Sequence, residues 1–264
     1  MKQRNILTIV FTLFCVATIM AQNVDNEKTG ILLVHYGTSN DKSRAQTIDK
    51  LNSRVAETFP DCAVVEAYSA PSVIKTLAKR GIKKLYISEM LRKEVSKVKN
   101  YFRAVSVVRP LLYSVDDCQI MIEMLTKSLL ADKSVATKKS QVVLVGHGSD
   151  SPANAMYCQI DYLLKAEGKS SWHVGTIEGF PKIENVEQQL RNSKNKNVIL
   201  VPLLYIAGNH QKDDIDGVWK TQLQTKGYHV DVLGKGLGEM AEIQDMIIAK
   251  IDAQIKAVNS EKAE

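Results

Sequence analysis

Short runs of apolar, β-branched residues alternate with helical patterns along most of this chain, and this alternation restricts the fold more than any other feature. The runs occupy residues 30–36, 62–68, 85–90, 141–145, 172–178, 198–204 and 228–233. Apolar residues between the runs recur at helical spacing, as Ile48, Leu51, Val55 and Phe59 do. Strands that alternate with amphipathic helices are typical of βαβ units. The sequence therefore predicts an α/β fold with parallel sheets flanked by helices.

Helical patterns predict a helix after most of these strands. The expected helices cover residues 43–59, a segment from 71, 95–104, 117–130, 152–165, 183–192, 216–226 and a segment from 240 onwards. Two shorter segments, 105–108 and 111–115, are predicted as strands. A loop through Gly208 and His210 is expected to lead from the strand at 198–204 to the helix at 216–226.

The two halves of the chain resemble each other, which predicts two similar lobes with a cleft between them. The matching segments are Leu33-Val34-His35-Tyr36-Gly37-Thr38 with Leu144-Val145-Gly146-His147-Gly148-Ser149, and 83–87 with 196–200. Residues 133–140 are polar and lack apolar periodicity, so we place the boundary there. The expected lobes are residues 22–135 and 136–264.

The first residues are expected to direct export and not to belong to the fold. Lys2 and Arg4 precede a mostly apolar stretch over residues 6–20, and the small Ala21 precedes a polar residue. This arrangement predicts a secretory signal peptide over residues 1–21. The alternative is an uncleaved anchor, but spanning a bilayer needs about 20 apolar residues. We therefore expect a bacterial periplasmic protein with no stable membrane span after processing.

The charge pattern disfavours nucleic acid as a partner. The formal net charge is +6, and basic residues are dispersed apart from the segment 92–103 and the Lys194/Lys196 loop. No aromatic-rich basic stripe accompanies them. A mild positive balance favours a small molecule with several carboxylates. Basic residues in the first segment could meet such carboxylates, although a solvated helix face is the simpler interpretation.

Two histidines and a glutamate lie at or just past the ends of apolar runs. His147 lies between glycines that allow close approach of a ligand, Glu178 lies in Ile-Glu-Gly-Phe-Pro, and His210 lies in Ala-Gly-Asn-His. The carboxyl ends of parallel strands line one crevice, so these three side chains are expected to meet there. Two imidazoles and a carboxylate suit a borderline divalent metal. Taken singly, the alternatives are a core histidine for His147, a salt bridge or a helix N-terminus contact for Glu178, and an exposed loop histidine for His210.

Other residues predict less. The lipase-type G-x-S-x-G motif is absent, and no arginine precedes His147. Gly234, Gly236 and Gly238 resemble a dinucleotide fingerprint with wrong spacing, so a turn is expected and no nucleotide. His35 is interpreted as cleft-lining or structural. No role is assigned to His173 and His229, and the spacing of Cys62, Cys118 and Cys158 predicts buried thiols, with one disulfide as the alternative.

From residue 30 to about residue 246 the chain resembles the anaerobic sirohydrochlorin cobalt chelatases, the CbiK-type class II chelatases. The shared motifs are Leu-Leu-Val-His-Tyr-Gly37-Thr38-Ser39, Val108-Arg109-Pro110-Leu111, Gly146-His147-Gly148, Glu178-Gly179-Phe180-Pro181, Ala207-Gly208-Asn209-His210, Trp219-Lys220 and Gly236-Leu237-Gly238-Glu239. The resemblance implies the class II chelatase fold of two flavodoxin-like lobes. It also implies that His147, Glu178 and His210 bind the metal and that His147 takes pyrrole protons. The implied substrates are a divalent metal, Co²⁺ or alternatively Fe²⁺, and sirohydrochlorin or a related tetrapyrrole.

The chain departs from the family at two positions near the expected cleft. It has Met90-Leu91-Arg92 where family members often place a histidine, which puts a haem-ligand role there in doubt. Asn209 replaces a common aspartate, which removes a charge that would orient His210.

Export also leaves two alternatives to cobalt insertion for cobalamin synthesis. One is the handling of iron or haem. The other is a metal, haem or tetrapyrrole carrier without physiological turnover. The oligomeric state stays open, with a homo-oligomer as one alternative.

Overall fold

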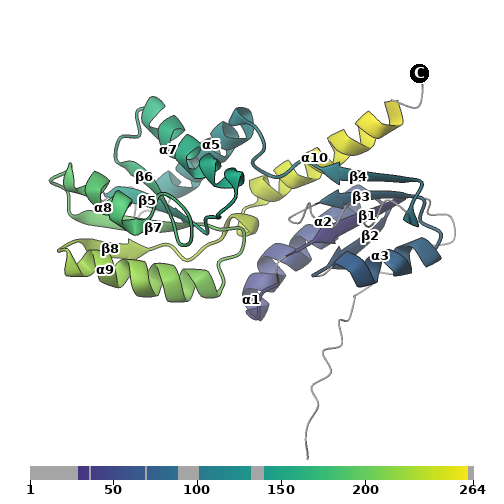
Figure 1. Cartoon of the computed structure of the whole chain (residues 1–264), viewed down its shortest axis with the longest axis horizontal. Coiled ribbons are helices and arrows are strands. Elements are labelled where there is room, and N and C mark those ends of the chain that lie inside the picture. Colours follow the sequence, from purple (N-terminus) through teal and green to yellow (C-terminus); the bar gives the residue numbers. More distant parts are fainter. Residues whose placement is uncertain (1–28, 36, 69, 89–100, 132–139, 261–264) are drawn as a thin grey trace, which may run out of the picture.

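The computed structural model describes residues 29–35, 37–68, 70–88, 101–131 and 140–260, and for residues 70–72 and 88 only the backbone. Its elements form two lobes that lie side by side, each built on a four-stranded parallel sheet (Figure 1). Within these ranges no helix is both long and apolar enough to cross a membrane. The α/β class and the parallel sheets predicted from the sequence are confirmed.

The N-terminal lobe has the strand order β2-β1-β3-β4. Its strands are β1 (Thr29–Val34), β2 (Ala63–Ala67), β3 (Lys84–Ser88) and β4 (Ala104–Val108). The segment after β1 is one continuous helical stretch made of α1 (Asp41–Arg44), the π-helical η2 (Ala45–Asp49) and α2 (Lys50–Thr58). Helix α3 (Ala70–Lys79) connects β2 to β3.

The C-terminal lobe repeats this arrangement with the strand order β6-β5-β7-β8. Its strands are β5 (Gln141–Gly146), β6 (Trp172–Thr176), β7 (Asn197–Leu203) and β8 (His229–Val232). Its helices are η5 (Pro152–Asn154), α7 (Ala155–Ala166), α8 (Ile183–Arg191), the π-helical η6 (His210–Trp219), α9 (Lys220–Thr225) and the short 3₁₀ turn η7 (Leu237–Glu239).

The identical strand order confirms that the two lobes are similar. In each sheet the first strand is internal, the second pairs on one side of it and the third on the other. Successive strands are therefore added first on one side of the internal strand and then on the other, so the strand order reverses between β1 and β3 and again between β5 and β7. Open parallel sheets bind ligands in the crevice at such a switch point, outside the carboxyl ends of the strands.

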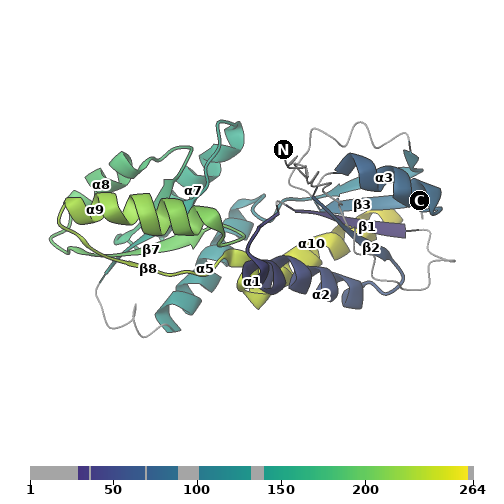
Figure 2. The same cartoon turned by 90° about the horizontal axis from the view of Figure 1, so that it is seen from below.

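Two helices cross between the lobes. Helix α5 (Val115–Ala131) follows the N-terminal sheet, yet its buried Met121 and Leu125 belong to the core of the C-terminal lobe. Helix α10 (Ala241–Ser260) ends the chain, yet its fully buried Ile251 packs with Leu33 and Tyr86 of the N-terminal sheet. Figures 1 and 2 show α10 running from the junction of the lobes along the first sheet. The expected boundary near residue 135 lies outside the described residues and stays a prediction.

Most predicted strands and helices match the structure within a few residues, with exceptions at the lobe junction. No strand forms at 111–115, because this segment makes the turn that leads into α5. The helix expected from 216 begins at His210, so the predicted loop is shorter than expected. Most of the helix expected at 95–104 lies outside the described residues, although Ala104 itself begins β4.

Candidate metal and catalytic site

His147 follows the last residue of β5 and is held between two glycines that the local backbone requires. A Cβ on Gly146 would lie 2.1 Å from a ring carbon of Tyr157. Gly148 has φ +85°, and a Cβ there would lie 2.3 Å from the backbone nitrogen of Gly179. Neither position has room for a side chain, so the imidazole of His147 projects from a tightly packed turn at the end of the sheet.

Glu178 is brought beside His147 because the pairing of β5 with β6 continues past the strand ends. The backbone nitrogen of Ile177 donates to the carbonyl of Gly146 at 2.9 Å, and that of Glu178 donates to the carbonyl of His147 at 2.7 Å. Nε2 of His147 and Oε2 of Glu178 are 3.8 Å apart, and both side chains are exposed (42% and 61%). The two predicted residues therefore lie side by side at the carboxyl end of the sheet, where a ligand can reach both.

The hydrogen bonds of His147 leave a lone pair directed at this carboxylate. Nδ1 lies 3.1 Å from the carbonyl oxygen of Gly148, which can only accept, so in the neutral imidazole Nδ1 is the donor and Nε2 holds the lone pair. Nε2 and the carboxylate of Glu178 then both present electron pairs. Two atoms that each bind a first-row cation such as zinc at about 2.1 Å lie roughly 3 to 4 Å apart. The separation of these two atoms falls within that range.

His210 is the first residue of η6 and completes the predicted trio. Its imidazole makes an edge-to-face contact with that of His147, with ring centroids 4.7 Å apart. Oδ2 of Asp214 accepts a hydrogen bond from Nδ1 of His210 at 2.7 Å, which leaves Nε2 of His210 as the unprotonated nitrogen. Asp214 therefore supplies the orienting carboxylate that Asn209 lacks.

The three side chains thus converge, with His147 touching both others. Among the described residues, however, no three His, Cys, Asp or Glu side chains already form a set that could hold one metal ion. The arrangement is a pair of contacts around His147, and a shared ion would draw the three groups closer. Their roles as metal ligands stay predictions.

One further residue, Asn154, shapes this site and was missed by the sequence analysis. Oδ1 of Asn154 accepts from the nitrogen of Ser149 at 3.0 Å, and Nδ2 of Asn154 donates to the carbonyl of Phe180 at 2.7 Å. Asn154 therefore ties the loop that carries His147 to the loop that carries Glu178. A polar residue at the start of a helix offered no signal for this role, because its partners are set by tertiary structure.

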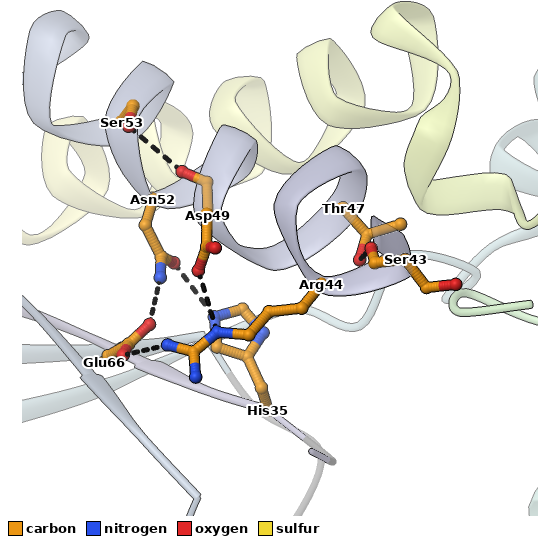
Figure 3. Close-up of polar contacts among 8 residues, drawn as sticks. All are labelled: His35, Ser43, Arg44, Thr47, Asp49, Asn52, Ser53 and Glu66. Carbon is orange, nitrogen blue, oxygen red and sulfur yellow. Dashed lines mark hydrogen bonds and ion pairs between the residues drawn. The ribbon is translucent and has the colours of Figure 1, made fainter. Parts of the chain in front are cut away.

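The N-terminal lobe presents a partly buried polar cluster at the carboxyl ends of β1 and β2 (Figure 3). Oδ1 of Asn52 accepts from Nε2 of His35 at 2.9 Å, and Nδ2 of Asn52 donates to Glu66 at 2.5 Å. Arg44 bonds both Glu66 and Asp49, at 3.2 and 3.1 Å. Burial raises the pKa of Glu66 and lowers that of His35. His35 is therefore a structural residue of this cluster, one of the two roles expected for it.

The remaining predicted features lie away from the trio. His173 is buried on β6 between Gln141 and Gln189, and burial, with nearby Lys165, lowers its pKa to about 4. Gly236 and Gly238 belong to the turn around η7, as expected. Cys62, Cys118 and Cys158 form no disulfide, and the prediction of buried thiols is confirmed for Cys118 but wrong for Cys158, which is exposed. Arg92, Lys93, Lys97 and Lys99, together with Met90, lie outside the described residues.

Known proteins resemble this chain over most of its length. The family model for cobalt chelatase (CbiK) matches residues 29–90 and 82–256. The chain is 24% identical to the sirohydrochlorin cobaltochelatase of Salmonella typhimurium over 89% of this chain and 100% of that one. It is 25% identical to sirohydrochlorin cobaltochelatase CbiKC of Nitratidesulfovibrio vulgaris over 90% and 94%. The structure of SirB from Bacillus subtilis with Fe³⁺ superposes with TM-score 0.65 at 16% identity, covering 89% of this chain and 98% of SirB.

Proposed function

Because this chain belongs to the cobalt chelatase (CbiK) family, we propose that it inserts Co²⁺, or alternatively Fe²⁺, into sirohydrochlorin or a related tetrapyrrole. One observation carries the proposal: His147 touches both Glu178 and His210 at the switch point of the C-terminal sheet. The curated relatives are named for this reaction.

The cation is a substrate in this reaction and must be bound loosely enough to leave. We propose that Nε2 of His147, Nε2 of His210 and the carboxylate of Glu178 replace part of its water shell. Three protein ligands leave coordination positions open, at which the tetrapyrrole nitrogens can displace the remaining water. The partial exposure of all three side chains is consistent with access by a large planar molecule.

Insertion of a divalent cation releases two pyrrole N–H protons, so the site needs proton acceptors. His147 is the proposed base, because Nε2 carries a free electron pair once the cation has moved to the macrocycle. Glu178 takes the second proton in this scheme, since its carboxylate faces the same space. Both groups return to their starting state by releasing protons to water, so neither a nucleotide nor a covalent intermediate is required.

The test is Co²⁺ insertion into sirohydrochlorin, followed by absorbance, with wild-type chain, His147→Ala, Glu178→Gln and His210→Ala. Each variant is expected to lose at least about a hundredfold in rate, in line with the loss of a base or metal ligand. His229→Ala is the control, because His229 is exposed at the start of β8, at the opposite end of the sheet. A folded His147→Ala variant with the wild-type rate would refute the proposed role.

The same assay separates an enzyme from a carrier. With excess Co²⁺ and sirohydrochlorin, an enzyme metallates many equivalents of tetrapyrrole per chain, whereas a carrier stops at one. A comparison of Co²⁺ with Fe²⁺ at equal free concentration then identifies the faster substrate. This comparison is needed because intrinsic affinity along the first-row series does not predict the metal that is used.

We further propose that the protein is exported. This proposal rests on the basic start, the apolar stretch and Ala21, all of which lie outside the described residues. Cell fractionation after expression of the whole chain is expected to find a processed product in the periplasm with a new N-terminus at Gln22. Recovery of the uncleaved chain in the cytoplasm would refute it.

A further inference from the structure

We propose that Ser43 of the N-terminal lobe is a positioning residue for His210, acting through the loop of residues 204–209, here called the junction loop. The proposal rests on the metal-binding role of His210 put forward above. It assigns part of the metal site's geometry to a residue of the other lobe.

The contact is a single buried hydrogen bond between the lobes. Oγ of Ser43 donates to the carbonyl of Ala207 at 3.1 Å, and Ser43 is only 9% exposed. The next residue of the junction loop, Gly208, also faces the N-terminal lobe, because a Cβ built there would lie 3.4 Å from Oγ1 of Thr38. His210 follows three residues after Ala207, so displacement of this carbonyl would move the start of η6.

The C-terminal lobe confines the junction loop from the opposite side. The backbone nitrogens of Leu237 and Gly238 donate to the carbonyls of Leu204 and Tyr205, both at 2.8 Å. A Cβ on Gly236 would lie 2.6 Å from the backbone nitrogen of Ala207. The loop therefore packs between the turn at Gly236 and the hydroxyl of Ser43, and both contacts together restrict its conformation.

Tyr205 ties the junction loop to both lobes at once. Its side chain packs against the core that contains Leu144 and also against the core that contains Leu33. Its hydroxyl is buried and has no hydrogen-bond partner among the residues that the structure describes, and burial raises its pKa. Apolar packing of this ring does not specify the position of Ala207, because it has no direction. The directional restraint on the carbonyl of Ala207 comes from Ser43.

Ser43 is itself held firmly. Oδ1 of Asn40 accepts from its backbone nitrogen at 3.0 Å, and Oγ1 of Thr47 donates to its carbonyl at 2.6 Å. The neighbouring Arg44 is anchored to the buried Glu66 (Figure 3). The polar cluster of the N-terminal lobe therefore fixes α1 on its sheet, and α1 presents the Ser43 hydroxyl to the junction loop.

The expected effect follows from the usual net contribution of one hydrogen bond, which changes an equilibrium roughly two- to tenfold. If the fraction of molecules whose junction loop has the metal-binding conformation falls by that factor, the apparent affinity for the cation falls by the same factor. We expect Ser43→Ala to raise the Kd for Co²⁺ and the KM for Co²⁺ about fivefold. At saturating Co²⁺, kcat stays within about twofold, because bound metal restores the arrangement.

The experiment compares the whole chain with Ser43→Ala, Ser43→Thr and Ser53→Ala. Ser53 is the matched control, because its hydroxyl donates to the carbonyl of Asp49 within the same helical stretch and is exposed. Amide hydrogen exchange without metal reports on residues 205–212, calorimetry with Co²⁺ alone gives Kd, and steady-state insertion gives KM and kcat. Ser43→Cys keeps the side-chain volume with a weaker donor and replaces Ser43→Ala if that variant does not fold.

The proposal predicts faster exchange at 205–212 and weaker Co²⁺ binding for Ser43→Ala, with Ser43→Thr and Ser53→Ala close to wild type. It is overturned if exchange at 205–212 is unchanged, if exchange rises while Kd does not, or if Ser53→Ala has the same effect. A wild-type chain that neither binds Co²⁺ nor metallates sirohydrochlorin would refute the proposed function instead. The exchange data would still decide whether Ser43 holds the loop.

Discussion

Replacement of Asp214 by asparagine is expected to weaken Co²⁺ binding about tenfold. The carboxylate accepts a hydrogen bond from Nδ1 of His210 at 2.7 Å, which fixes the orientation of the ring and leaves Nε2 as the nitrogen available to a metal. Carboxylates that orient a metal-binding imidazole typically contribute ten- to a hundredfold to metal affinity. Here the two side chains are 33% and 49% exposed, so water screens the charge and the lower end applies. Tenfold corresponds to about 1.4 kcal/mol.

The assay is calorimetric titration of the whole chain with Co²⁺. Asp216→Asn provides the control, because Asp216 lies on the same π-helix but pairs with Lys220, at 2.8 Å. We expect Asp216→Asn to bind within about twofold of wild type. Equal affinities of Asp214→Asn and wild type would show that Asp214 does not orient a metal ligand, and would weaken the case that His210 is one.

Three other predictions concern stability, each measured by urea unfolding. The pKa of His173 falls from 6.5 to about 4 in the folded state, so between these pH values the unfolded chain binds one more proton than the folded chain. The free energy of unfolding therefore drops as the pH falls from 6.5 to 4, by up to about 3 kcal/mol. His173→Gln should make this decline shallower, and an unchanged pH dependence would contradict the prediction. Gly148→Ala should lower the free energy of unfolding by roughly 3 kcal/mol, since its Cβ would clash with the backbone of Gly179. Gly168→Ala is the control, at φ +77° with no described atom within 4 Å, and should lower it by only about 1 kcal/mol. Equal losses for the two variants would show that the clash at Gly148 does not matter. Ile251→Ala should lower the free energy of unfolding by about 3 kcal/mol. It should also speed amide hydrogen exchange in β1 and β3, because Ile251 of the last helix packs on the N-terminal sheet. Faster exchange in the C-terminal sheet alone would contradict this packing.

The positions of His147, Glu178 and His210 could be predicted in part from the ends of the strands that precede them. In a parallel sheet every carboxyl end lies at one edge, so residues close to the ends of β5, β6 and β7 are brought to the same side of the sheet. His147 and Glu178 satisfy this rule, because sheet pairing extends to them. For His210 the rule located the end of the strand but not the π-helix that begins at this residue.

Other parts of the site depend on contacts between segments that carry no local signal. Asp214 was one acidic residue among several, and its selection depends on the helical spacing of η6. Asn154 matters only because two loops meet beside it. The strand expected at 111–115 was wrong for a similar reason, since an apolar run there belongs to the turn into α5.

The order of apolar runs, their periodicity and the residues that follow them determined the α/β class, the repeated lobes and the choice of His147, Glu178 and His210. These features are local, because a side chain's place on a strand or helix follows from backbone period alone. Only the tertiary structure decided that α5 and α10 pack on the opposite lobes, that Asp214 orients His210 and that Ser43 meets Ala207. Each of these depends on distant segments being packed together, and the free energy of that packing is a property of the whole fold.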